Sequence, residues 1–299
     1  MKALLHLRRR FASHQIVQIS KIFFLLKEGF MARPNQRNGR GDGRGEDYSK
    51  RRRSVGGDQV EGRQSVKELV FANRRSVEQI WIEETVVRKG IVNEIIEKSV
   101  NRRIPVHTVS TRRFESAVRS EGSQGVIAFC AALREVELSE LVTSKTNPFL
   151  LVIDGITDPR NLGAILRSGE LAGVTGVVLP SHRSAMVTPS ATKAAAGAIE
   201  YLDFSLVPGV PSALMELQKL NVLCVGLDLN GTSTIYDLPK FEETPVALVL
   251  GAEDKGMSRL TAERCDLIAK IPQFGRLDSL NISVAASIAM FEIARSRVK

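Results

Sequence analysis

Apolar residues recur along this chain with two periods, one typical of strands and one typical of helices. From residue 62 onward the two patterns alternate, and each change falls at a short polar or glycine-containing segment. Short continuous apolar runs are typical of buried parallel strands, and apolar positions three and four residues apart are typical of amphipathic helices. The alternation predicts an α/β fold, and the length of 299 residues has room for two domains.

The first domain is predicted over residues 58–133 as a small alternating α/β unit. Its helices are expected at 62–72, 88–100 and 111–118, and its strands at 78–83, 104–109 and 125–133. Residues 134–147 are expected to link it to a second domain, 148–299. The strands of that domain are expected at 149–153, 176–180, 222–226, 246–250 and 266–271.

A capped helix is predicted directly after the first strand of the second domain. Asp158 is a preferred N-cap residue and Pro159 fits the first helical position, while Gly173 is suited to end the helix. An amphipathic helix of small and apolar residues does not itself require Asn161 and Arg167. These two side chains are therefore candidates for function.

Two later segments join a predicted strand to glycine. VALVLGAEDKGMS runs from a strand into a turn that contains Gly251 and Gly256, and glycine permits close approach of a ligand to the backbone. IPQFGRLDSLNISVAAS joins a strand and a Pro/Gly loop to a helix over 281–297 that is rich in alanine and serine. Taken alone, the first segment could be an ordinary loop and the second ordinary packing material.

Basic charge is concentrated before residue 58. The formal net charge is +9, yet residues 1–57 hold 14 Lys/Arg against 4 Asp/Glu, so the remainder of the chain is close to neutral. The Gly/Arg-rich stretch 40–57 has too few apolar residues to offset its ordering entropy, which predicts disorder. Arg51, Arg52 and Arg53 are candidates for binding RNA phosphates. A solubilising arm without a specific partner is an equal alternative.

Residues 1–30 permit two interpretations. Their apolar run, 22–26, is far shorter than the roughly 20 residues that span a bilayer, so no membrane partner is expected. An arginine-rich, acid-poor leader is typical of a mitochondrial or plastid transit peptide. Alternatively Met31 is the true start of a bacterial cytoplasmic protein, and we favour this interpretation.

Several other site classes lack their sequence patterns. Cys130, Cys224 and Cys265 are far apart and have no zinc-ligand spacing, so they are expected to be reduced thiols. The histidines form no HExxH pair, and no metal is expected. No GxGxxG or GxxxxGK[ST] motif follows a predicted strand, which argues against a nicotinamide or ATP site.

Three segments resemble the three motifs of the SpoU (TrmH) branch of the SPOUT RNA 2'-O-methyltransferases. They are DPRNLGAILRSGE at 158–170, LGAEDKGMS at 250–258 and IPQFGRLDSLNISVAAS at 271–287. The resemblance covers roughly residues 147–299 and implies a SPOUT domain with a parallel sheet and a deep trefoil knot. The first domain resembles the L30e-like RNA-binding domain of the RlmB group of this family, although Ser123 stands where the family has histidine.

The resemblance also implies residue roles. The implied catalytic residues are Asn161, Arg167, Glu253, Ser279 and Asn281. The implied S-adenosylmethionine-binding residues are Leu250, Gly251, Ile271, Ser279 and Leu280. A guanidinium with a pKa above about 12 is a poor base, so we expect Arg167 to hold phosphate and hydroxyl in line for attack. Arg160 is a further candidate for RNA contact.

The activity implied is S-adenosylmethionine-dependent ribose 2'-O-methylation of a guanosine in 23S ribosomal RNA. Transfer RNA is the alternative substrate, and a non-catalytic RNA-binding ribosome-assembly protein is the alternative of another class. Because the family completes its sites at a two-fold interface, a homodimer is expected. The last helix offers an apolar stripe made of Ile282, Ala285, Ala286, Ala289 and Ile293. This stripe could form that interface or equally belong to the core.

Overall fold

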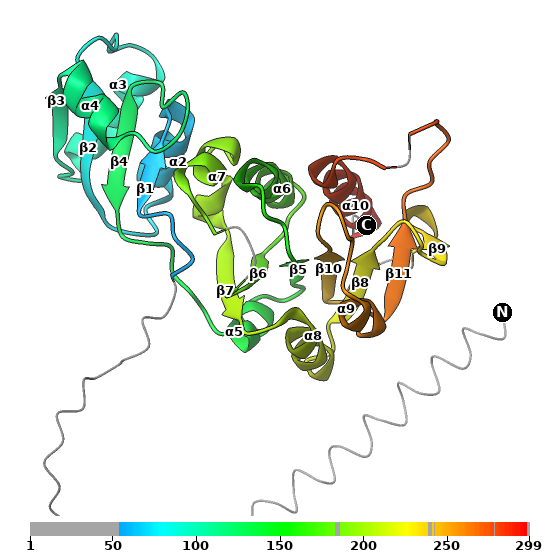
Figure 1. Cartoon of the computed structure of the whole chain (residues 1–299). Coiled ribbons are helices and arrows are strands. Elements are labelled where there is room, and N and C mark those ends of the chain that lie inside the picture. The colour runs from blue at the N-terminus through cyan, green and yellow to red at the C-terminus, as the bar shows by residue number, and fades with distance from the viewer. Residues whose placement is uncertain (1–53, 183–185, 239–240, 242, 278, 298–299) are drawn as a thin grey trace, which may run out of the picture. The chain divides into compact units, whose positions relative to one another are not determined.

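A computed structural model describes residues 54–182, 186–238, 241, 243–277 and 279–297 (Figure 1). Residues 1–53 lie outside the described ranges. The predictions for the leader, for a start at Met1 or Met31, and for Arg51, Arg52 and Arg53 concern these residues. The described chain contains two sheets, each with helices on both faces. The α/β class expected from the sequence is confirmed.

The first domain is built on a four-stranded sheet of order β1-β4-β2-β3. Strand β4 is antiparallel to β1 and β2, whereas β3 is parallel to β2. The strands are β1 (Gln59–Glu61), β2 (Val77–Glu83), β3 (Val106–Val109) and β4 (Val126–Cys130). The helices are α2 (Arg63–Ala72), α3 (Ile91–Asn101) and α4 (Thr111–Ala117). Helices α2 and α3 pack on one face of the sheet, and α4 packs on the other through the buried Phe114.

The second domain is built on a seven-stranded parallel sheet of order β7-β6-β5-β10-β8-β11-β9. Its strands are β5 (Phe149–Ile153), β6 (Gly176–Pro180), β7 (Asp203–Val207), β8 (Leu223–Leu227), β9 (Ser233–Thr234), β10 (Val246–Leu250) and β11 (Leu267–Lys270). The central strands are buried on both faces, as expected for a parallel sheet that helices cover on each side.

Helices form a layer on each face of this parallel sheet (Figure 1). One layer contains α6 (Pro159–Leu171), α7 (Pro189–Ala194) and α10 (Ile282–Arg297), together with the 3-10 helices η1 (Ala198–Tyr201) and η2 (Ile235–Asp237). The other contains α5 (Leu138–Thr143), α8 (Val210–Lys219) and α9 (Arg259–Glu263). Helix α5 lies within the segment that we expected to be only a linker, and its Leu138 and Leu141 join the core of this second layer.

Helix α6 begins where the sequence predicted. The Asp158 carboxylate accepts a hydrogen bond from the backbone N–H of Arg160 at 2.8 Å, and Pro159 occupies the first turn. The helix ends at Leu171, two residues before Gly173, whose φ is 82°. Local capping chemistry thus fixes the position of the candidate side chains on this helix.

Of the two alternatives for the apolar stripe on α10, the structure supports the core for its later part, whereas Ile282 and Ala285 at the start of the helix are only partly buried. Ala286, Ala289 and Ile293 have no exposed surface. Helix α10 approaches α6 closely, and the Ser287 hydroxyl donates a hydrogen bond to the Ser168 hydroxyl at 2.8 Å. Small side chains permit this approach, so α10 uses its alanine-rich side to close its own domain.

The folded region begins earlier than the boundary at residue 57 that we predicted. Val55 is fully buried in the core of the second domain. Its carbonyl accepts from the backbone N–H of Val187 at 3.0 Å, and the Val187 carbonyl accepts from the N–H of Gly57 at 2.9 Å. A single buried valine in a polar stretch gives no periodic signal, which explains the difference.

A buried ion pair joins the two domains. Arg75, just beyond α2, donates to the Glu200 carboxylate of η1 at 2.9 and 2.6 Å, and the two side chains are 7% and 3% exposed. Burial opposes charging of Arg75, but the hydrogen bonds and charge of Glu200 leave the Arg75 pKa above its ordinary value. Nearby, the Ser65 hydroxyl donates to the Thr192 carbonyl at 3.0 Å. The domains therefore share specific polar contacts in addition to the chain connection.

Candidate active site

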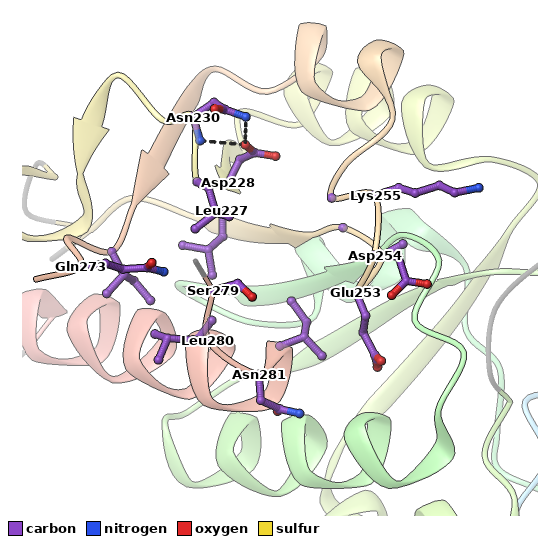
Figure 2. A pocket seen from close by; sticks show the side chains of 17 residues that line it. Leu227, Asp228, Asn230, Glu253, Asp254, Lys255, Gln273, Ser279, Leu280 and Asn281 are labelled. Carbon is purple, nitrogen blue, oxygen red and sulfur yellow. Dashed lines mark hydrogen bonds between the residues drawn. The ribbon is translucent and has the colours of Figure 1, made fainter. Parts of the chain in front are cut away.

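A cavity of about 580 Å³ opens at the carboxyl ends of β8, β10 and β11 (Figure 2). Ligands of open parallel sheets bind at this edge. The cavity is lined by Leu227, Asp228, Leu229, Asn230, Gly251, Ala252, Glu253, Asp254, Lys255, Gly256, Ile271, Gln273, Ser279, Leu280, Asn281, Ile282 and Ala285. Of the five predicted donor-binding residues, only Leu250 does not line it. Leu250 is the fully buried last residue of β10 and directly precedes the lining.

The turn after β10 depends on Gly251. Ala252 and Gly256 exchange two backbone hydrogen bonds of 2.9 Å, which fold the turn back on itself. A Cβ at Gly251 would lie 2.2 Å from both the Gly256 carbonyl carbon and the Met257 nitrogen, closer than atoms can pack. The backbone rather than side chains therefore shapes this wall of the cavity.

We expect Gly251→Ala to reduce affinity for S-adenosylmethionine by roughly tenfold or more, because the added methyl forces the cavity wall to move. Isothermal titration calorimetry with the purified chain measures this. Gly209→Ala is the matched control, since φ there is −165° and nothing lies within 4 Å of the added Cβ. Equal affinities for the two variants and the parent would contradict the expectation.

Three predicted catalytic residues from distant segments meet beside the cavity. Asn161 Nδ2 donates to Glu253 Oε1 at 2.6 Å, and Asn281 Nδ2 donates to Asn161 Oδ1 at 3.3 Å. Asn281 Oδ1 in turn accepts from the backbone N–H of Ser283 at 2.8 Å, which orients it at the start of α10. Figure 2 shows Glu253, Ser279 and Asn281 around the same cavity. These hydrogen bonds between two amides and a carboxylate connect α6, the turn after β10 and the start of α10.

The segment 227–230 also lines the cavity, and no prediction from the sequence covered it. Asp228 directly follows β8, and its Oδ1 accepts from the backbone N–H of Asn230 at 2.9 Å and from the Asn230 amide at 3.2 Å (Figure 2). A polar Asp-Leu-Asn-Gly turn at the end of an apolar strand was the available signal. The lining holds the carboxylates of Asp228, Glu253 and Asp254 against one ammonium, Lys255, so it favours a cationic ligand.

Arg167 does not line this cavity. It lies on an exposed side of α6, and Arg160 is exposed two helical turns earlier on the same side, about 10 Å away along the axis. Asn161 and Ser168 share a different side of the helix, which faces α10. Within one chain, the predicted amides and most of the predicted donor-binding residues lie at the cavity, whereas the predicted catalytic arginine lies outside it. The role of Arg167 stays a prediction.

In the part of the chain that the structure describes, no cluster of three or more His, Cys, Asp or Glu side chains is placed to hold a metal ion. No helix within the described ranges is long and apolar enough to cross a bilayer.

Comparisons with known proteins agree with this geometry. The model of the SpoU rRNA Methylase family matches residues 148–291, and a model for RNA 2'-O ribose methyltransferase substrate binding matches residues 59–136. The chain is similar to the Haemophilus influenzae 23S rRNA (guanosine-2'-O-)-methyltransferase RlmB, with 42% identity over 65% of this chain and 80% of the relative. Its identity with the RlmB of Neisseria meningitidis is 34%, over 80% of this chain and 95% of the relative.

The crystal structure of the SpoU methyltransferase AviRb from Streptomyces viridochromogenes, in complex with AdoMet, superposes with a TM-score of 0.69. It covers 80% of this chain and 89% of that chain at 20% identity, so it bears on the fold alone. Fold and site together define an α/β methyltransferase of the SpoU type. The chain belongs to the SpoU rRNA methylase family.

Proposed function

We propose that this protein transfers a methyl group from S-adenosylmethionine to the 2'-hydroxyl of a guanosine ribose in 23S ribosomal RNA. The observation that carries the proposal is the hydrogen-bonded chain Glu253–Asn161–Asn281 at the donor-sized cavity. Family membership and the RlmB relatives support the same reaction and the same class of RNA.

The cavity fits the donor. Gly251 and Gly256 offer backbone groups that no side chain of their own covers, and the apolar side chains of Leu227, Ile271 and Leu280 suit a purine ring. Excess carboxylate charge suits a sulfonium cation. The bound donor supplies an electrophilic methyl group, and the residues of this chain bind it and fix its orientation.

The acceptor side requires different groups. The ribose hydroxyl must be held in line with the methyl carbon while negative charge develops on its oxygen. Asn161, braced by Glu253 and Asn281, is a rigid polar group that can orient the ribose. Arg167 and Arg160 are exposed cations that can hold adjacent phosphates. Because Arg167 does not line its own cavity, we infer that it acts in the cavity of a second subunit.

The test is methyl transfer from radiolabelled S-adenosylmethionine to ribosomal RNA purified from cells that lack this protein. We expect incorporation of the labelled methyl group into 23S RNA. A synthetic RNA fragment in which the target guanosine carries a 2'-deoxy sugar should not be methylated. Incorporation only into transfer RNA would support the alternative substrate. RNA binding without any transfer would overturn the enzymatic proposal and support a ribosome-assembly role.

We also propose a homodimer, formed through the side of α10 opposite the core. Val284 and Phe291 on α10 are 47% and 49% exposed, and Leu171 at the end of α6 is 67% exposed. Helical spacing places Val284 and Phe291 on one side together with the partly buried Ile288. Exposed apolar side chains on the helices that carry the arginines fit a two-fold contact in which the same surface of two subunits meets. Such a contact would bring Arg167 of one subunit to the cavity of the other.

Phe291→Glu is expected to convert the dimer into a monomer and to abolish methyl transfer, because it places a charge in the apolar contact. Light scattering at micromolar concentration and the transfer assay measure the two effects. Phe71→Glu is the control, since Phe71 is 41% exposed on α2, far along the chain from this surface. A fully active Phe291→Glu monomer would contradict the proposed dimer.

A further inference from the structure

One face of the first domain's sheet is covered only in part. Helix α4 spans seven residues and seats Phe114 against this face. The strand register places Trp81 beside Ile127 on one side and His107 on the other, and Gln79 beside Phe129. Because side chains alternate between faces, these residues share the α4 side of the sheet. Trp81 and Phe129 are only partly buried, and His107 is exposed.

The two aromatic rings carry a cation and polar groups around them. The rings of Trp81 and Phe129 meet edge to face, with centroids 5.1 Å apart at 68°. The guanidinium carbon of the exposed Arg113 lies 4.7 Å from the centroid of Trp81. Trp81 Nε1 donates to Gln79 Oε1 at 2.8 Å, which restrains the orientation of the indole. The partly open sheet thus presents aromatic rings, a guanidinium and an amide together.

We propose that this aromatic face, defined by Gln79, Trp81, His107, Arg113 and Phe129, binds unpaired bases of the RNA substrate. The inference rests on the proposed function for the nature of its ligand. Bases stack on aromatic and guanidinium planes of open sheets, and an amide and an imidazole can bond their edges. A cation over the ring suits the phosphates that accompany each base.

The electrostatics of the face agree with an anionic ligand. Helix α4 carries two exposed arginines, Arg112 and Arg113, against one exposed carboxylate, Glu115, and the carboxylate of Glu84 accepts from the N–H of Thr111 at the start of the helix. The Glu61 carboxylate points to the same side of the sheet but is fully buried, and it accepts hydrogen bonds from the Gln59 amide, the N–H groups of Arg119 and Ser120, and the Ser120 hydroxyl. Its charge is therefore turned inward.

A second aromatic residue beside cations serves as a comparison. Phe71 lies on α2, over the other face of the sheet, with Lys67 and Lys98 at 5.6 and 5.3 Å from its ring centroid. Lys67 is already paired with Glu94 at 2.6 Å, and within the described residues no aromatic ring pair includes Phe71. This helical site lacks the flat surface that successive bases need.

Trp81 is the only tryptophan of the chain, so its fluorescence reports directly on the aromatic face. Titration of the full-length protein with a short unstructured oligoadenylate is expected to quench that fluorescence as the oligomer binds. Inorganic polyphosphate, which has charge but no bases, should leave the emission unchanged at equal charge. Unchanged emission at saturating oligoadenylate, with saturation established by anisotropy of a labelled oligomer, would overturn the proposal.

Three variants separate stacking from folding. Trp81→Leu is expected to weaken oligoadenylate binding by about tenfold, and Trp81→Phe, which keeps a ring, by no more than about threefold. Phe71→Leu should bind like the parent, and an equal loss in Phe71→Leu would overturn the assignment to this face. Thermal unfolding confirms that each variant is folded.

Methyl transfer is measured separately from oligoadenylate binding. Methyl transfer without a change in Trp81 fluorescence would reject the aromatic face alone. A change in Trp81 fluorescence without methyl transfer would reject the proposed reaction alone.

Discussion

Replacing Arg167 with alanine is expected to reduce methyl transfer by about a hundredfold or more while leaving S-adenosylmethionine affinity within about twofold of the parent. The structure separates the two functions, because Arg167 is exposed on α6 and absent from the donor cavity. Removing one positioned donor of a developing negative charge typically costs about 10²- to 10³-fold in turnover. Arg167 makes no contribution to the cavity wall, so donor binding should persist.

Single-turnover methylation and calorimetric donor binding test this pair of expectations. Arg259→Ala is the matched control, because Arg259 is an exposed arginine on α9 whose partner is Glu263 on the same helix. Near-normal turnover of Arg167→Ala would reject the assignment of this residue. A parallel loss of donor affinity would instead place Arg167 at the donor cavity.

Complementation between variants tests whether Arg167 acts across subunits. The assay uses S-adenosylmethionine at a concentration well below the dissociation constant of the Gly251→Ala variant, so that the altered cavity is largely empty. Under these conditions a heterodimer of an Arg167→Ala chain and a Gly251→Ala chain has one functional site if the arginine crosses the interface, and none if it acts within its own chain. Random pairing of equal amounts would restore about a quarter of the sites of the parent. Co-expression of differently tagged chains allows the heterodimer to be isolated. An inactive heterodimer would show that Arg167 acts within its own chain.

Glu200→Gln is expected to destabilise the protein by about 3–5 kcal/mol, because it leaves the Arg75 cation buried without a counter-charge. The pair is only 7% and 3% exposed, so solvent cannot replace the lost carboxylate. Urea unfolding followed by circular dichroism measures the overall loss. Since the pair joins the two domains, Trp81 fluorescence, which reports on the first domain, should then change at a different urea concentration from the circular dichroism signal.

Two comparisons test this second expectation. Glu140→Gln removes an exposed ion pair with Arg134, whose side chains are 47% and 80% exposed, and should cost less than about 1 kcal/mol. Replacing both Arg75 and Glu200 with leucine removes the unpaired charge and should recover most of the lost stability. A Glu200→Gln protein as stable as the parent would mean that the ion pair does not hold the domains together.

Local signals in the sequence predicted the elements that carry the site. Asp158 and Pro159 fix the start of α6, and therefore the position of Asn161, through capping chemistry that operates within a few residues. Apolar runs predicted the central strands because such runs are buried on both faces of a parallel sheet. The glycine turn after β10 was predicted only through its resemblance to a family motif, and the structure adds the steric reason for Gly251, where an added Cβ would clash with Gly256 and Met257.

Features that depend on partners distant in sequence could not be predicted in the same way. An apolar helical stripe such as Ala286, Ala289 and Ile293 indicates that this side of the helix is buried. It does not indicate whether α6 or a second subunit buries it. Arg167 matched a motif, yet its side of the helix relative to the cavity depends on how α6 is seated on the sheet. Asp228 was missed because a polar residue after a strand is common and only the tertiary fold shows that it reaches the cavity.

The position of β10 also has a consequence for how the protein is made. Strand β10 lies between β5 and β8 in the sheet, although both precede it in the chain. During synthesis from the N-terminus, the sheet therefore lacks its middle until residue 250 has left the ribosome, and the wall from Ile271 to Ala285 is made later still. The first domain, complete by Cys130, can fold and meet RNA well before then. A ribosomal RNA could thus be held by a nascent chain that has no donor site yet.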